Sequence, residues 1–143
     1  VRDSRHRAVL LTGLEKNQPV NLPQNVLALN YAPHGWIMSR CSAVVHHGGI
    51  GTTAQALRAG LPSVLCPYAF DQPNNAMRVQ ALGAGIVLHP KRRDARRLRE
   101  AIERVANEPS FRESAQAIAQ KIAEENGPSC AAQHLDQFFN AFR

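Results

Sequence analysis

One segment of the sequence, HHGGIGTTAQALRAGLPSVLCPYAFDQPNNA at residues 46–76, places imidazoles, glycines, hydroxyls and a carboxylate at spacings that could bind an anion. A short apolar run precedes its two histidines, and a helical stretch opens at Thr52. Backbone N–H groups at a helix start carry partial positive charge and favour a phosphate. About twenty residues further on, Asp71 and Gln72 supply a polar pair that could read hydroxyl groups. The segment therefore predicts a site for a phosphorylated, hydroxyl-rich ligand.

An alternation of apolar runs and helical stretches predicts the elements that position this segment. Continuous apolar runs, typical of buried parallel strands, lie at residues 8–12, 26–30, 43–46, 63–66 and 85–88. Helices are expected near residues 35–41, 52–59, 73–82, 95–107, 110–126 and 129–142. Asp94, Ser110 and Ser129 are the expected N-caps of the last three helices. The pattern predicts an α/β fold, a Rossmann-like doubly wound parallel sheet of five or six strands, with its ligand at the carboxyl ends of the strands.

Length and composition limit the class of protein. A chain of 143 residues is long enough for one domain, residues 1–143, with a single core. No apolar run approaches the ~20 residues that cross a membrane, and no signal peptide is expected. Three cysteines without metal-type spacing favour a reducing compartment, so a cytoplasmic location is expected. The sequence starts with valine, close to a strand, which favours a fragment or one half of a larger enzyme.

The net charge is +6, and basic residues gather before and within one helix. The gathered residues are Lys91, Arg92, Arg93, Arg96, Arg97 and Arg99. Such a patch could bind nucleic acid or an anionic membrane. Arg96 and Glu100, like Arg99 and Glu103, are four residues apart and can pair along a helix. We interpret the cluster as a solvated helix face and expect no nucleic-acid partner.

The glycine turn also fits a dinucleotide fingerprint. Residues 49–54, GIGTTA, match G-x-G-x-x-A, and Asp71 lies twenty residues past Gly51. An NAD-dependent Rossmann enzyme is therefore one alternative. Two strands precede this turn, however, whereas the fingerprint normally follows the first strand of its unit. Cys66-Pro67 also ends the next strand before Asp71, so the context argues against a dinucleotide.

A second motif, YAPH at residues 31–34, gives the segment a more specific meaning. Together the two resemble the donor-binding signature of family 1 glycosyltransferases, nearest to bacterial and fungal enzymes that glycosylate sterols, polyketides and peptide antibiotics. The similarity is strong over residues 7–90 and looser over the helical tail. It implies the C-terminal, nucleotide-sugar-binding half of a two-domain architecture called GT-B. It also implies an inverting transferase that moves a hexose from a nucleoside-diphosphate sugar to an acceptor hydroxyl. UDP-glucose is the expected donor, and neither a cofactor nor a metal is expected.

The resemblance implies that the YAPH motif binds the nucleoside. Tyr31 stands where the family commonly has a tryptophan that stacks on uracil, and a phenol ring can stack as well. Ala32 matches the residue whose backbone reads the base edge. His34, which is Gln in plant members, would reach the ribose. Tyr31 could instead merely pack at a strand end, and His34 could be a surface cap on the following helix.

The resemblance assigns the long segment to the diphosphate and the sugar. His47 would donate to the diphosphate, while Gly49 and Gly51 let the backbone approach the phosphates. Thr52 would add a hydroxyl, and the helix start up to Thr53 would meet the charge of the leaving phosphate. Gln55 replaces the Glu that binds both ribose hydroxyls in many members. The alternative for this turn is a glycine helix cap without a ligand.

Asp71 and Gln72 match the family pair that binds the sugar hydroxyls, and Asn75 would fix their turn. A turn-forming Asp before a helix is the alternative. His46 should point away from His47 and pack. Adjacent histidines can indicate a metal, but no carboxylate or cysteine accompanies them at ligand spacing.

The resemblance places no catalytic residue in this chain beyond His47, which would stabilise the leaving group. The base that activates the acceptor, and most of the pocket for a lipid, sterol or natural-product acceptor, would belong to a missing N-terminal domain. The chain alone is therefore expected to bind donor without transferring sugar. A non-catalytic nucleotide-sugar-binding subunit that needs a partner chain is one alternative, and a nucleotide-sugar epimerase is another.

Overall fold

The computed structural model describes residues 5–141, without the side chain of Arg92. Its strands are β1 (Ala8–Leu11), β2 (Val26–Leu29), β3 (Val44–His46), β4 (Ser63–Leu65) and β5 (Gly85–Val87). Its α-helices are α1 (His34–Met38), α2 (Ile50–Arg58), α3 (Gln72–Ala81), α4 (Ala95–Asn107), α5 (Pro109–Glu124) and α6 (Gly127–Asn140). Short 3₁₀ turns, η1 (Glu15–Asn17) and η2 (Pro90–Arg92), complete the order. The α/β class and the positions of the expected strands are confirmed.

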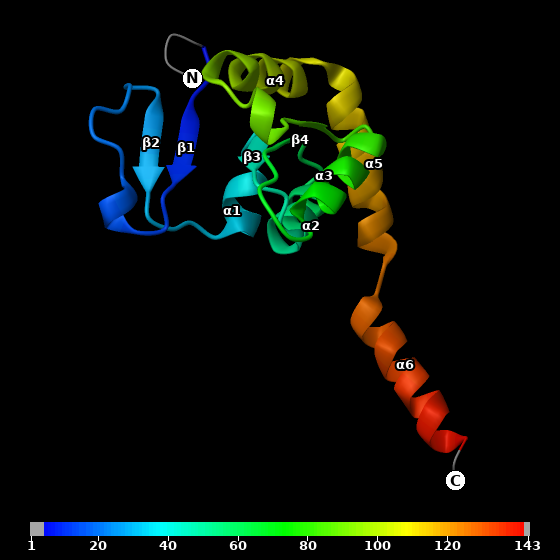
Figure 1. The fold of residues 1–143 in the computed structure, drawn as a ribbon. Coiled ribbons are helices and arrows are strands. Elements are labelled where there is room, and N and C mark those ends of the chain that lie inside the picture. Colours follow the sequence, from blue (N-terminus) through cyan, green and yellow to red (C-terminus); the bar gives the residue numbers. More distant parts are fainter. Residues whose placement is uncertain (1–4, 142–143) are drawn as a thin grey trace.

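All strand pairs are parallel, but they form two sheets rather than the single sheet that we predicted (Figure 1). In one sheet β1 pairs with β2, with Ala8 opposite Val26. In the other the order is β3-β4-β5, and Val64 lies opposite both Val45 and Ile86. The prediction of one continuous sheet is wrong for residues 5–141. Hydrophobic periodicity locates a strand, but it does not specify which strand lies beside it.

The core lies around β4, whose three residues are all buried. Val64 packs on one face of the sheet with Ala101 and Val105 of α4. Leu65 packs on the other face with residues of α3 and with Ala115 of α5. Helices therefore cover both faces of the β3-β4-β5 sheet, as Figure 1 shows, and the pattern explains why these strands are apolar on both sides.

Two of the three predicted helix caps are wrong. Asp94 does cap α4, because its carboxylate accepts from the Arg97 N–H at 2.8 Å. Helix α5 begins at Pro109, ahead of Ser110, and Asn126 rather than Ser129 caps α6. Proline fits the first turn of a helix because its missing N–H is unpaired there anyway, so both helices start earlier than expected. The last residue of the predicted helix 129–142 lies outside the described residues.

The basic cluster lies around the start of α4. Among its described side chains Lys91, Arg93, Arg96 and Arg99 are exposed and Arg97 is half-buried. Arg96 pairs with Glu100 at 2.8 Å, as predicted from their spacing. Glu103 pairs with His6 at 3.0 Å, which joins the segment before β1 to α4. The side chain of Arg92 lies outside the described part of the structure. None of the helices within residues 5–141 is long and apolar enough to cross a membrane.

Candidate functional site

The glycine turn joins β3 to α2 and leaves the start of that helix open. Gly48 is buried and has φ +88°, a conformation that favours glycine. Gly49 is the N-cap of α2, and no described side chain accepts a hydrogen bond from the helix start. The first N–H groups of an α-helix have no partner within the helix. This end of α2 can therefore donate to an anion such as a phosphate.

His47 lies directly beside this helix start. A Cβ built on Gly49 would lie only 2.5 Å from Nε2 of His47, so the imidazole packs over the glycine. His47 is exposed, which leaves its ring accessible to a ligand. A side chain at position 49 would therefore displace the His47 ring.

His46 has a different environment from its neighbour. It is half-buried, and its Nδ1 accepts from the Gly48 N–H at 3.1 Å. Burial, together with the nearby His47 and His34, lowers the pKa of His46 to about 4. The ring is therefore neutral at pH 7 and supports the turn through its acceptor nitrogen.

The threonines of the turn differ in what they can offer a ligand. Thr53 is buried, and its hydroxyl donates to the Gly49 carbonyl at 2.9 Å, so its proton is used within α2. Thr52 is half-buried and Gly51 is exposed at the same helix start. Thr53 therefore supports the start of α2, and a hydroxyl contribution from Thr52 stays a prediction.

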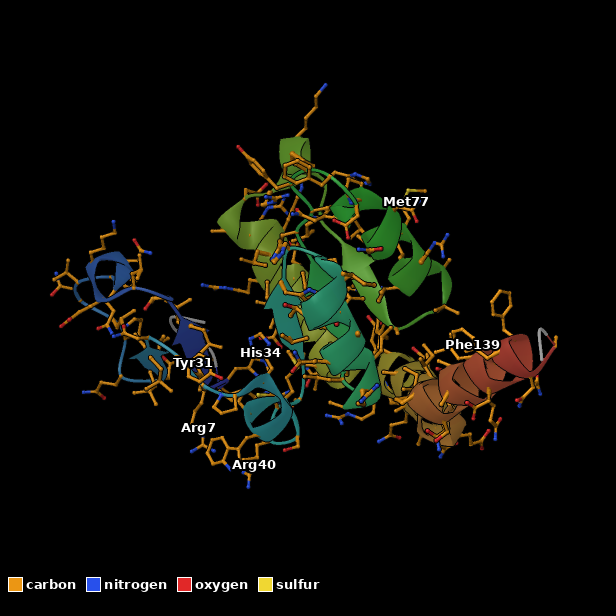
Figure 2. The ribbon with its side chains drawn as sticks, turned by 90° about the horizontal axis from the view of Figure 1, so that it is seen from below. Arg7, Tyr31, His34, Arg40, Met77 and Phe139 are labelled. Atoms are coloured by element: carbon orange, nitrogen blue, oxygen red, sulfur yellow. The ribbon has the colours of Figure 1, made fainter. Side chains whose placement is uncertain are left out.

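A pocket of about 410 Å³ brings the YAPH motif together with α2. Its lining residues are Tyr31, Ala32, Pro33, His34, Gly35 and Gln55. Tyr31 is 79% exposed, so its ring is available for stacking and is not simply packed at the strand end. Figure 2 labels Tyr31 and His34 at the junction of β2 and α1, across the molecule from Phe139 of α6. The predicted nucleoside residues are thus gathered in one hollow.

His34 is the first residue of α1, which starts one residue earlier than predicted. Pro33 rather than His34 is the N-cap of that helix, and no side-chain hydrogen bond caps its start. The alternative in which the His34 side chain caps α1 is therefore not the arrangement in the structure.

The start of α3 carries the Asp71-Gln72 pair. Asp71 is exposed, and its Oδ2 accepts from Nδ2 of Asn75 at 2.7 Å. The Gln72 side-chain oxygen accepts from the N–H groups of Tyr68 at 2.8 Å and Ala69 at 3.2 Å. Gln72 thus holds the loop with its oxygen, which leaves only its amide N–H groups for a ligand. Gln72 is therefore expected to act toward a ligand only as a hydrogen-bond donor.

Gly48 and Asn75 carry contacts that sequence reasoning did not fully predict. The Asn75 side chain also donates to the Gly48 carbonyl at 3.0 Å and so joins α3 to the glycine turn. The Gly-Gly pair of the turn was the sequence signal for a conformation that only glycine adopts readily. In residues 5–141 no group of three or more His, Cys, Asp or Glu side chains could hold a metal ion.

Comparison with known proteins finds a matching protein family and similar enzymes. Residues 7–138 match the family "Erythromycin biosynthesis protein CIII-like, C-terminal domain". A sterol 3-beta-glucosyltransferase of Saccharomyces cerevisiae (strain YJM789) is 40% identical over 112 residues, which are 78% of this chain and 9% of that protein.

Solved structures give the same result at the level of the fold. The glycotransferase of kitacinnamycin has a TM-score of 0.82 and 27% identity, over 92% of this chain and 34% of that one. The glycosyltransferase VinC, solved in complex with DTDP, has a TM-score of 0.73 and 28% identity, over 85% and 38% of the two chains. The chain therefore spans about a tenth of the yeast relative and little more than a third of these two solved chains.

Proposed function

This chain belongs to the Erythromycin biosynthesis protein CIII-like C-terminal domain family of GT-B glycosyltransferases, and on that basis we propose that it holds the nucleotide sugar for a glycosyltransferase. The proposed reaction is an inverting, metal-independent transfer of glucose from UDP-glucose to an acceptor hydroxyl. The observation that carries the proposal is the open start of α2, with His47 packed over Gly49 beside it. This arrangement offers several N–H donors to a diphosphate without a metal ion.

The diphosphate is proposed to lie at the start of α2. In the transfer, the acceptor oxygen bonds to C1 of the sugar while the bond from C1 to the β-phosphate oxygen breaks. The electron pair stays on the diphosphate, and the acceptor proton passes to a base outside this chain. The N–H groups of α2 and the ring of His47 would stabilise the charge that grows on the leaving group.

The nucleoside is proposed to occupy the pocket of about 410 Å³. Tyr31 would stack on the base, and Gln55 would bind a ribose hydroxyl through its amide. Uridine is our first choice of base and thymidine is the second, since VinC was solved with DTDP. Glucose is supported by the name of the yeast relative and by the carboxylate of Asp71, which accepts strongly from hydroxyls.

The acceptor is proposed to be a sterol, another lipid or a natural product. Support comes from the names of the relatives alone, a sterol 3-beta-glucosyltransferase and the glycotransferase of kitacinnamycin. The Asp71 and Tyr31 sites both serve the donor, so the acceptor would bind mainly to another domain or a partner chain.

Calorimetry with purified chain tests the proposal directly. UDP-glucose is expected to bind, and NAD is not. Binding of thymidine diphosphate glucose, compared with UDP-glucose, tests which base the pocket prefers. Preference for NAD would refute the proposal and restore the dinucleotide interpretation. Transfer to an acceptor by residues 1–143 alone would refute the claim that this chain only holds the donor.

Two variants separate the proposed subsites. His47→Ala is expected to weaken UDP and UDP-glucose alike, between about tenfold and a hundredfold, because it removes one charge-assisted hydrogen bond. Asp71→Ala is expected to weaken UDP-glucose while sparing UDP, because its partners are sugar hydroxyls. His134→Ala and Asp136→Ala are matched controls on the exposed helix α6. Equal losses of UDP and UDP-glucose in Asp71→Ala would contradict the role of Asp71.

A further inference from the structure

We infer that Asn75 is a positioning residue that links the diphosphate site to the sugar site through one side-chain amide. The inference rests on the proposed function, because it assumes that the glycine turn and Asp71 bind two parts of one ligand. The linked groups, Gly48 and Asn75, are 27 residues apart in sequence, and they come from the turn between β3 and α2 and from helix α3. No contact between Asn75 and the ligand is required.

The amide of Asn75 makes both connections with the same nitrogen. Nδ2 donates to the Gly48 carbonyl at 3.0 Å and to Oδ2 of Asp71 at 2.7 Å. A primary amide nitrogen has two hydrogens, so these two bonds use its full donor capacity. Asn75 is half-buried, which shields the bonds in part from water. The nitrogen is therefore a fixed junction between the turn and the carboxylate.

Gly48 extends this hydrogen-bonded path toward the proposed diphosphate site. Its N–H donates to Nδ1 of His46 at 3.1 Å, while its carbonyl accepts from Asn75. A Cβ at Gly48 would lie 3.1 Å from the Gln72 carbonyl oxygen, so the turn packs closely on the start of α3. The hydrogen-bonded path runs from His46 through Gly48 and Asn75 to Asp71. A shift of α3 therefore changes the turn that precedes the N–H groups of α2.

The bond to Asp71 has a direct consequence for the sugar. A carboxylate held at Oδ2 keeps Oδ1 in one orientation, free to accept from a hydroxyl. Without Asn75 the exposed carboxylate can rotate, and fixing it on binding costs conformational entropy. Loss of Asn75 should thus resemble a partial loss of Asp71, with a smaller effect on the diphosphate.

The first test compares Asn75→Ser and Asn75→Ala with Asn74→Ala. Asn74 is the matched control, because it is the adjacent asparagine of α3 and its side chain pairs with Arg78 at 2.8 Å, outside this path. In calorimetry the Asn75 variants are expected to bind UDP-glucose about tenfold more weakly, and UDP less than about threefold more weakly. Asn74→Ala is expected to bind both ligands like the parent chain.

The second test uses pH and remains informative if the first variants fold poorly. Asn75→Asp places two carboxylates within hydrogen-bond distance, and such a pair shares a proton because both cannot easily ionise. UDP-glucose binding by this variant is expected to weaken as pH rises from 5 to 8. His46 and His47 on the turn and Arg78 on α3 are present in both variants, so Asn74→Asp controls for their titration and charge. A structural role for Asn75 alone would not create this pH dependence.

The outcomes separate the inference from the proposed function. If the parent chain binds neither UDP-glucose nor UDP, both are overturned. If the parent binds and the Asn75 variants match the Asn74 variants, the inference alone is wrong. Equal weakening of UDP and UDP-glucose in Asn75→Ser, or an unchanged pH profile in Asn75→Asp, would also overturn it. Circular dichroism of each variant establishes that the fold is retained.

Discussion

His46 should make the fold sensitive to mild acid. Its ring is half-buried at the end of β3, and Nδ1 accepts from the Gly48 N–H. Protonation turns that nitrogen into a donor and so breaks the bond that supports the glycine turn. Burial, with His47 and His34 nearby, lowers the pKa of His46 from 6.5 to about 4. The unfolded chain therefore binds a proton more readily than the folded chain does.

The size of the effect follows from this difference in pKa. The stabilisation is fully present above pH 6.5 and is lost as the pH falls toward 4, because only the unfolded state is protonated in that window. Between pH 7 and pH 5 the free energy of unfolding should fall by about 2 kcal/mol on this account. Hydrogen bonds from His6 and Arg104 lower the pKa values of Glu103 and Glu108. The stabilisation that these two carboxylates contribute is therefore lost at lower pH than that of His46.

Urea unfolding at pH 5, 6 and 7 measures the effect. The comparison is His46→Asn, whose side-chain oxygen can accept from Gly48 but does not titrate. The parent chain is expected to lose about 2 kcal/mol more than the variant between pH 7 and pH 5. An equal loss in both proteins would refute the assignment of this pH dependence to His46.

Three further predictions follow from the turn and the helix caps. Gly49→Ala should displace the His47 ring and weaken UDP binding about tenfold in calorimetry, whereas Gly127→Ala on α6, which meets no atom within 4 Å, should leave it unchanged. Gly48→Ala should lower the free energy of unfolding by about 1–3 kcal/mol in urea, because φ is +88° there and a Cβ would approach the Gln72 carbonyl. Asp94→Ala should lower the urea midpoint in the same assay by removing the cap of α4, and an unchanged midpoint would contradict the capping role.

Much of the fold could be predicted because its signals are local. The run at residues 63–65 is apolar on both faces, and the structure buries it between α4 on one side and α3 with α5 on the other. The GIGT turn likewise indicates that a strand ends there and a helix begins. Helix starts were predicted less well, because Ser110 was the expected cap of α5, whereas the helix begins one residue earlier at Pro109, with Glu108 as its N-cap.

The candidate site could be predicted as a set of residues but not as a set of bonds. The family resemblance implied that Thr53 and Gln72 belong to the ligand site, yet the Thr53 hydroxyl bonds to Gly49 and the Gln72 oxygen bonds to its own loop. The Thr53 hydroxyl is short enough to reach the backbone of its own helix, and the longer Gln72 side chain reaches back across its loop. Sequence alone does not decide whether such a group bonds to the backbone or to a ligand. The bond from Asn75 to Gly48 depends on how α3 packs against the turn, which no local pattern contains.

The open sides of β1 and β3 affect how the chain behaves at high concentration. Within the described residues β1 pairs only with β2 and β3 only with β4, and Val9, Leu10 and Val45 remain 43%, 39% and 44% exposed. An unpaired strand edge is a template for a strand from any other chain. Solutions of residues 1–143 should therefore self-associate as concentration rises, and their melting temperature should depend on the amount of protein.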